Sequence, residues 1–114
     1  MIGLSLETKD EMLAIFTGQA LTVGLFDGEN ELSDPRYERL PVEFSSPQGD
    51  DMRFIENANE IRFDDMGRDH TVDHWGIFDE RGNLMALYRL SQPREVPAED
   101  NFVFRVGRLR IGLP

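Results

Sequence analysis

The stretch His74–Leu90, HWGIFDERGNLMALYRL, decides the fold because it has the pattern of a β-hairpin. Two apolar runs, Trp75–Phe78 and Leu84–Leu90, flank the polar segment Asp79–Asn83. A five-residue segment with one Gly and one Asn fits the longer class of hairpin loop, since both residue types tolerate positive φ at low cost. Both faces of the second run are largely apolar until Arg89, which predicts a central strand covered on two sides.

Further strand signals lie on both sides of this hairpin. Runs rich in β-branched and aromatic residues, separated by turn residues, predict strands at Ala20–Phe26, Tyr37–Phe44, Met52–Ile55, Glu60–Phe63 and Phe102–Leu113. Pro41 makes its run either an edge strand or a bulged one, and Pro93 and Pro97 bracket an extended connection. The apolar parity of the last run changes at Gly107, which predicts a β-bulge. The fold class is therefore mainly β, an antiparallel β-sandwich or flattened barrel.

One N-terminal helix is predicted within residues 1–18. Thr8 and Glu11 are spaced as in a capping box, Ser5 offers an earlier start, and Gly18 stands where a left-handed cap would end the helix. Its apolar face comprises Met12, Leu13, Ile15 and Phe16. Such a short helix needs a packing partner, which is either an open edge of the sheet or another protein. The chain is predicted to be a single domain, residues 1–114, with the β-sandwich over residues 20–114.

Composition excludes several classes of function. The 114 residues carry a net charge of −10, which disfavours a free-standing nucleic-acid binder and adsorption to an anionic membrane. The absence of Cys excludes disulfides and thiolate metal sites. No apolar run approaches the ~18 residues of a membrane span, and the N-terminus lacks the basic region of a signal peptide. We therefore expect a soluble protein made inside the cell, with no nucleic-acid or membrane partner.

The segment DHTVDH is the main candidate for a metal site. On a helix, His70 and His74 would lie on one face and could share a zinc ion. The β-branched and aromatic residues around them favour a strand, in which four residues span roughly 13 Å. Two ligands of one ion cannot be that far apart, so structural or solvated histidines are favoured, and no metal or cofactor is predicted.

No enzyme signature emerges from the remaining polar residues. The paired carboxylates lack the spacing of a calcium loop, and none stands out as a glycosidase pair; they are Asp50–Asp51, Asp64–Asp65, Asp79–Glu80 and Glu99–Asp100. No serine lies in a nucleophile elbow, and no Gly-rich loop precedes a helix. The prediction is a protein that is not an enzyme.

Two surfaces are predicted to make contacts instead, and one loop is predicted to be an exposed tip. The basic residues Arg105, Arg108 and Arg110 alternate along the last predicted strand, either as a solvated face or as an assembly contact with an acidic neighbour. The helix offers a second contact surface through Met12, Ile15 and Phe16. The polar loop at 45–51 is expected to be an exposed tip, with Ser46, Gln48 and Asp50 at its surface.

The order of these segments carries a resemblance that covers nearly the whole chain. Its most specific part is the hairpin, in which HWGIFD and Gly82-Asn83-Leu84 are similar to a pattern H-x-G-I-F-D-x-x-x-G-N-L. The matching segments elsewhere are Glu11–Phe16, Leu21–Phe26, Tyr37–Val42, Asn57–Phe63 and Pro93–Leu113. Together they resemble a family of small tailed-bacteriophage structural proteins, commonly called phage tail fibre proteins. The chain departs from this family in its higher charge and in a Glu99-Asp100 turn where Gly-Asp is usual.

The resemblance implies a non-enzymatic virion protein made in the host cytoplasm. It would be attached in multiple copies as a tail fibre or tip component, or as a capsid decoration (cement) protein. Its partners would be other phage structural proteins and further copies of itself, since virion parts are usually symmetric oligomers. An alternative is a lectin-like module for host glycans using Trp75, Tyr37 and Tyr88, and a less favoured one is a small metal-dependent enzyme.

Overall fold

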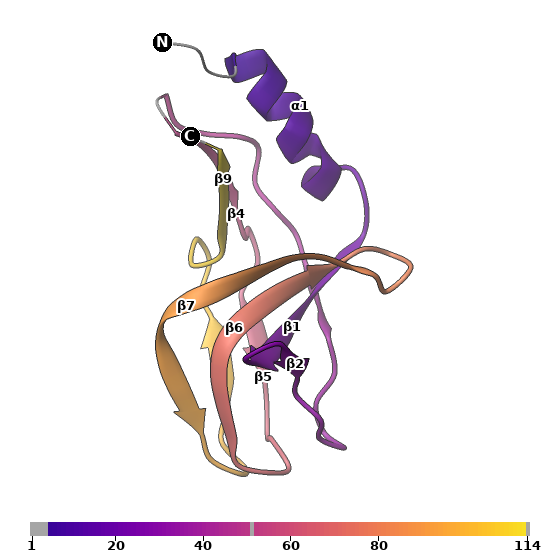
Figure 1. Ribbon diagram of the computed structural model, residues 1–114, viewed down its shortest axis with the longest axis vertical. Helices are drawn as coiled ribbons and strands as arrows, with labels where there is room; N and C mark the ends of the chain where they lie inside the picture. The colour runs from indigo at the N-terminus through magenta and orange to yellow at the C-terminus, as the bar shows by residue number, and fades with distance from the viewer. Residues whose placement is uncertain (1–4, 51, 114) are drawn as a thin grey trace.

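The computed structural model describes residues 5–50 and 52–113 of the chain, so residues 1–4 of the predicted helical segment, Asp51 of the predicted loop and Pro114 lie outside the described residues. One helix precedes nine strands (Figure 1). In chain order the elements are α1 (Leu6–Thr17), β1 (Leu21–Asp27), β2 (Asn30–Glu31), β3 (Leu40–Val42), β4 (Arg53–Glu56), β5 (Ile61–Phe63), β6 (His70–Phe78), β7 (Leu84–Val96), β8 (Phe102–Phe104) and β9 (Arg110–Leu113).

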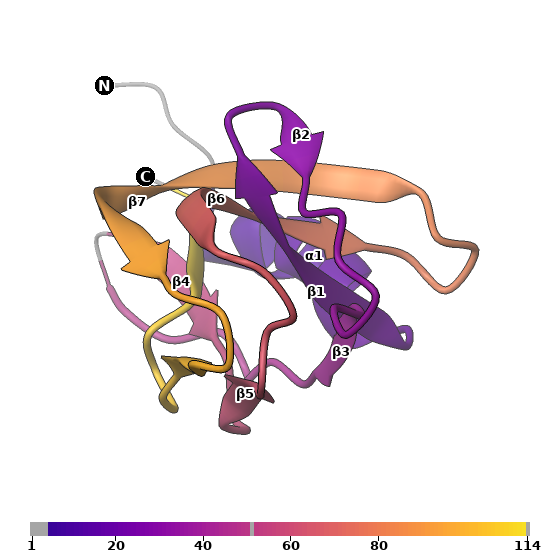
Figure 2. The ribbon, with the colours of Figure 1, turned by 90° about the horizontal axis from the view of Figure 1, so that it is seen from below.

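The strands form three antiparallel sheets. The largest has the order β2-β1-β6-β7, with β3 also paired to β1, while β4 pairs with β9 and β5 with β8 (Figure 2). The core between them holds the buried apolar side chains of all three sheets and Leu13 of α1. The predicted mainly β, antiparallel architecture with one N-terminal helix is confirmed.

The hairpin at the centre of the sequence forms as predicted. Strands β6 and β7 pair from Phe78↔Leu84 onward, and the loop between them is closed by the carboxylate of Asp79, which accepts from the backbone N–H groups of Arg81 and Asn83. Gly82 has φ 84°, the left-handed conformation that Gly adopts most readily. The five-residue loop is therefore built on the turn chemistry that its sequence indicates.

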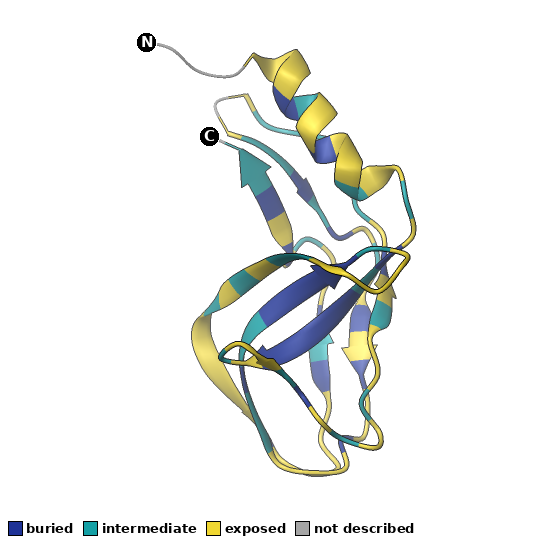
Figure 3. Ribbon diagram, turned by 45° about the vertical axis from the view of Figure 1, so that its right-hand side comes forward, coloured by how far each residue is buried: buried dark blue, intermediate teal, exposed yellow. Residues whose placement is uncertain are grey.

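The position of β7 in the sheet differs from the prediction. This strand is at the sheet edge, and Leu84 is 47% exposed, whereas β1 and β6 are central and contain fully buried residues such as Leu25 and Ile77 (Figure 3). Apolar residues on both faces of a strand carry no information about its lateral neighbours, and the exposure of Leu84 and Leu87 shows that the faces of β7 are not fully covered. The prediction of a central strand at Leu84–Leu90 is therefore wrong.

Strand β7 also continues beyond its predicted end. The register passes from His74↔Arg89 to Val72↔Arg94, so the segment Leu90–Pro93 bulges out opposite Asp73. Pro93, which lacks a backbone N–H, lies in this unpaired segment and interrupts no ladder hydrogen bond. The extended connection predicted between Pro93 and Pro97 is largely a strand.

The last predicted strand is in fact two strands. β8 pairs with β5 and β9 pairs with β4, and Gly107, with φ 83°, lies in the turn that separates them. Val106 is 60% exposed instead of sharing the buried face of β8. The change of apolar parity at Gly107 thus marks a passage from one sheet to another and not a bulge within one strand.

Helix α1 begins one turn earlier than its capping box predicts. The backbone N–H of Thr8 donates to Ser5 Oγ (3.1 Å), which makes Ser5 the N-cap and leaves Thr8 inside the helix. Gly18 ends the helix with φ −92°, so the predicted left-handed cap is wrong. Leu13 is buried, and α1 packs against β4 and β9 (Figure 1). The helix therefore covers a sheet edge region, the first of the two alternatives.

Candidate functional site

A groove lined by arginines lies between β7 and the segment from β8 to β9. Two adjoining depressions, of about 580 Å³ and about 400 Å³, share Trp75, Arg89 and Arg108 in their walls. We call this surface the basic groove and define it by its five arginines, Arg89, Arg94, Arg105, Arg108 and Arg110. Trp75, Phe102 and Leu109 form its buried apolar walls.

The charge of the basic groove is opposite to that of the whole chain. Its lining contains no Asp or Glu, although the chain has 22 acidic residues and a net charge of −10. Arg110 reaches Glu56 Oε2 (3.1 Å) and lies over the ring of Phe54 (4.6 Å). The other four arginines form no ion pair within residues 5–50 and 52–113. The groove is therefore a positive surface in which the described chain supplies an ion-pair partner to Arg110 but to none of the other four arginines.

Arginines elsewhere in the molecule are mostly paired. The arginine ion pairs outside the groove are Arg36–Asp65, Arg39–Glu31, Arg53–Asp10, Arg62–Glu60 and Arg62–Asp64. Only Arg68 and Arg81, both exposed, resemble the groove arginines in forming no ion pair among the described residues. Because acidic side chains are abundant on this surface, four unpaired arginines in one groove form a distinct chemical feature.

Asn57 positions the turn that carries Arg105 and Arg108. Its side chain is fully buried and donates to the carbonyl oxygen of Arg105 (3.0 Å), while its Oδ1 accepts from the N–H of Leu109 (2.9 Å). Its backbone N–H donates to Leu109 O, and its carbonyl accepts from Gly107 N–H. These bonds fix both ends of the turn, so the two arginines project from a rigid backbone.

The groove also lies between two strand edges that have no partner. β7 pairs only with β6 and β8 only with β5 within the described chain. Figure 2 shows β7 turning toward the segment that contains β8 at one side of the molecule. Unpaired strand edges present backbone N–H and C=O groups that a further extended chain can satisfy.

The predicted basic residues are found together, but not on one strand. Arg105 and Arg108 flank the turn and Arg110 begins β9, so their predicted alternation along a single strand is wrong, although all three line the groove. Sequence reasoning missed Arg89 and Arg94 as members of the site. Arg89 lies in the second predicted hairpin run and Arg94 in the predicted connection after it, and nothing in the sequence indicates that both converge with residues 105–110.

None of the predicted contact residues on α1 lines the basic groove. Met12 and Ile15 are exposed, at 41% and 54%, while Phe16 is half-buried and makes an edge-to-face contact with Phe44 (6.5 Å between ring centroids). Met12 and Ile15 therefore remain a separate predicted contact surface, whereas Phe16 contributes to packing.

The predicted loop tip is only partly exposed. Ser46 and Asp50 are exposed, but Gln48 is half-buried. Gln48 exchanges two backbone hydrogen bonds with Phe54, and its side chain donates to Glu56 Oε1 (3.2 Å). The prediction of Gln48 as an exposed tip residue is wrong, because these bonds fold the loop back onto β4.

The two histidines lie in β6 and each contacts a carboxylate. His70 Nε2 is 2.7 Å from Asp34 Oδ2, and His74 Nδ1 is 2.7 Å from Asp73 Oδ1. Hydrogen bonds from backbone N–H groups, that of Arg36 foremost, and from His70 lower the pKa of Asp34 to about 2. Among residues 5–50 and 52–113, no three acidic or histidine side chains gather as metal ligands would. The predicted extended geometry of this segment is confirmed.

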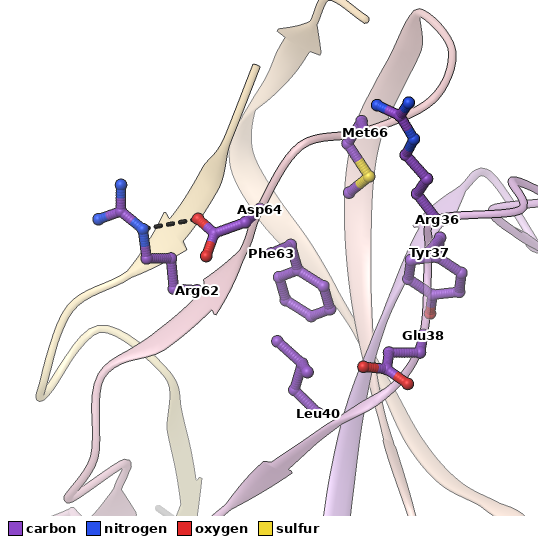
Figure 4. Close-up of a pocket in the computed structure, with 8 residues that line it drawn as sticks. All are labelled: Arg36, Tyr37, Glu38, Leu40, Arg62, Phe63, Asp64 and Met66. Atoms are coloured by element: carbon purple, nitrogen blue, oxygen red, sulfur yellow. Dashed lines mark hydrogen bonds and ion pairs between the residues drawn. The ribbon is translucent and has the colours of Figure 1, made fainter. Parts of the chain in front are cut away.

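The aromatic residues proposed for glycan binding are engaged inside the fold. Trp75 is 5% exposed and stacks on Tyr88, with 4.7 Å between ring centroids. The Tyr37 hydroxyl donates to Glu31 (2.6 Å), and its ring stacks on Phe63. Figure 4 shows Tyr37 beside Phe63 in a small depression of about 180 Å³. Trp75 is thus buried, and Tyr37 and Tyr88 are half-buried with one stacked neighbour each.

Comparisons with known proteins give one family. A family model described as Podophage GP4 fiber I protein gp80 matches residues 9–112. No curated protein matches the chain significantly. Within the described residues, no helix has the length and apolar character needed to cross a membrane. The matched range includes the whole hairpin and every arginine of the basic groove.

Proposed function

The chain belongs to the Podophage GP4 fiber I protein gp80 family, and from this premise we propose that it is a non-enzymatic structural subunit of a phage fibre, present in multiple copies on the particle. The observation that carries this proposal is the extent of the match, which covers residues 9–112 and thus nearly the whole folded chain. The family identifies the chain as a phage structural protein; its place on the particle and its copy number are the proposed part.

The structure supports a role that works through surfaces. A concave feature of its surface, the basic groove, is walled by arginines and buried apolar residues. Arginine binds carboxylates in fixed, bidentate geometry, which suits recognition of another protein. Its partners would be other phage structural proteins and further copies of this chain, assembled after synthesis in the host cytoplasm.

The copy number of the protein in purified virions tests the proposal. Quantitative mass spectrometry against the major capsid protein should give a small number of copies, as expected for a fibre. A ratio near one would instead assign the protein to capsid decoration, and its absence from purified particles would contradict the virion role itself.

A further inference from the structure

We propose that the basic groove binds an extended, carboxylate-rich polypeptide segment of a neighbouring protein, which adds as a strand along the open edges of β7 and β8. This inference rests on the proposed function only for the statement that the neighbour is a virion protein. The chemistry of the occupant follows from the groove itself.

The charge of the groove selects an acidic occupant. Four of its five arginines have no ion-pair partner in the described chain, and no acidic side chain lines the depression. The chain has a net charge of −10, so this groove is a local positive surface that attracts an acidic partner. A carboxylate placed here accepts charge-assisted hydrogen bonds from arginines that contact no carboxylate in the described chain.

The backbone of the groove selects an extended polypeptide. β7 and β8 each have one unpaired edge, and residues of both strands, including Leu90 and Val103, line the same depression. A peptide strand satisfies such edges through its own N–H and C=O groups, while its side chains alternate between the two faces. Carboxylates on alternate positions would then face the arginines.

Two other classes of polyanion fit the groove less well. A carboxylated glycan gains its affinity from stacking on exposed aromatic rings as well as from charge, and Trp75, the indole in the groove wall, is 5% exposed. A nucleic acid extends beyond the groove on both sides and would meet the negative surface of the rest of the chain. A short acidic strand contacts only the positive surface.

The groove is also preorganised for binding. The buried side chain of Asn57 holds the turn with Arg105 and Arg108 by hydrogen bonds at both of its ends. Arg110, a further arginine of the groove, is held over the ring of Phe54 and against Glu56. Fewer degrees of freedom are therefore lost when a ligand binds.

Binding of an alternating Glu-Val peptide tests the proposal. We expect a peptide of about eight residues, long enough to follow the groove, to change the fluorescence of Trp75 and to show saturable binding in calorimetry. Trp75 is the only Trp of the chain, so the signal reports this site. Added salt should weaken the binding, because charge pairs contribute to it.

Two matched double variants separate the groove from general charge. Arg105→Glu with Arg108→Glu should weaken peptide binding by at least about tenfold, since two charge-assisted contacts become repulsive. Arg68→Glu with Arg81→Glu changes the net charge by the same amount at exposed, unpaired arginines outside the groove and should leave binding within about twofold. Equal losses in the two variants would overturn the assignment to the groove.

A peptide N-methylated at alternate residues tests strand addition and does not depend on any protein variant. Methylation removes backbone donors while keeping every carboxylate, so binding should fall by at least about tenfold. Unchanged binding would overturn strand addition. Tighter binding of oligogalacturonate or of single-stranded DNA than of the peptide, at equal charge, would overturn the polypeptide as occupant.

Failure here is distinguishable from failure of the proposed function. A protein that is present in virions but binds no acidic peptide retains its fibre role and loses the groove assignment. A protein that binds the peptide but is absent from virions keeps the groove chemistry, and the partner must then be sought outside the particle.

Discussion

The surface around Glu31 and the basic groove use the same residue type in opposite ways. Near β1, Arg39 donates twice to the Glu31 carboxylate (2.9 and 2.8 Å) and lies 3.5 Å above the Phe78 ring, while Tyr37 donates to the same carboxylate. In the groove, four arginines contact no carboxylate of the described chain. Arg39 is paired within the fold and therefore stabilises it, whereas the four groove arginines are available to a partner. The following predictions test or sharpen this contrast.

The largest effect is expected at Asn57, which supports the groove from inside. Asn57→Ala leaves the Leu109 N–H and the Arg105 carbonyl buried without their side-chain partner, which should lower the free energy of unfolding by about 3 kcal/mol. Chemical denaturation measures this change. Asn101→Ala, at an exposed residue with one hydrogen bond to Asp65 N–H, is the matched control and should cost less than about 1 kcal/mol. Similar losses in both variants would show that Asn57 is not a special support.

The next effect concerns the cluster around Glu31, where Gly24 allows close packing. A Cβ at Gly24 would lie 2.7 Å from Tyr37 Oη, 2.8 Å from the Phe78 ring and 2.9 Å from Glu31 Oε2. Gly24→Ala should therefore lower the free energy of unfolding by about 2 kcal/mol through overpacking. Thermal denaturation measures the loss. A variant as stable as the wild type would mean that Glu31 and Tyr37 move aside without cost, which would contradict tight packing of this cluster.

Removal of one arginine from each region compares them directly. Arg39→Ala should lower the free energy of unfolding by about 1 kcal/mol, because it removes a bidentate ion pair and a cation–π contact. Arg105→Ala should change it by less than about 0.5 kcal/mol, because its side chain has no intramolecular ion-pair partner in the described chain. Parallel urea titrations measure both changes. A larger loss for Arg105 than for Arg39 would contradict the proposed division between stabilising and partner-binding arginines.

The last and smallest expected effect is the acid sensitivity that Asp34 gives to the fold. Its side chain is fully buried and joins two loops through His70 and the N–H groups of Gly67 and Arg68. Since its pKa is lowered to about 2, its stabilising contribution is present above the ordinary value near 4 and is lost as pH falls through about 2. Melting temperatures between pH 5 and pH 2 should fall more steeply for the wild type than for Asp34→Asn. Parallel curves for the two proteins would exclude Asp34 as the acid-sensitive group.

Local elements were predictable where the chemistry was local. The hairpin loop from Asp79 to Asn83, the alternation that buries Ile61 and Phe63, and the edge position of Pro41 all follow from residue types and spacing. The helix start was displaced by one turn because Ser5 and Thr8 are both competent caps, and the structure uses Ser5.

The candidate site was only half predictable. Arg105, Arg108 and Arg110 are close in sequence and were identified as a basic surface, but Arg89 and Arg94 join them from another strand. Their convergence depends on the bulge at Leu90–Pro93 and on the turn fixed by Asn57, and both are long-range features.

The sequence by itself determined the mainly β class, the central hairpin, the acidic surface and the family resemblance, because residue type and short-range periodicity encode them. The tertiary structure alone decided that β7 is an edge strand, that the last run divides between two sheets, and that five arginines share one groove. Lateral strand neighbours and contacts such as Asn57 with Leu109 join residues far apart in the chain, and periodicity along one segment carries no information about them.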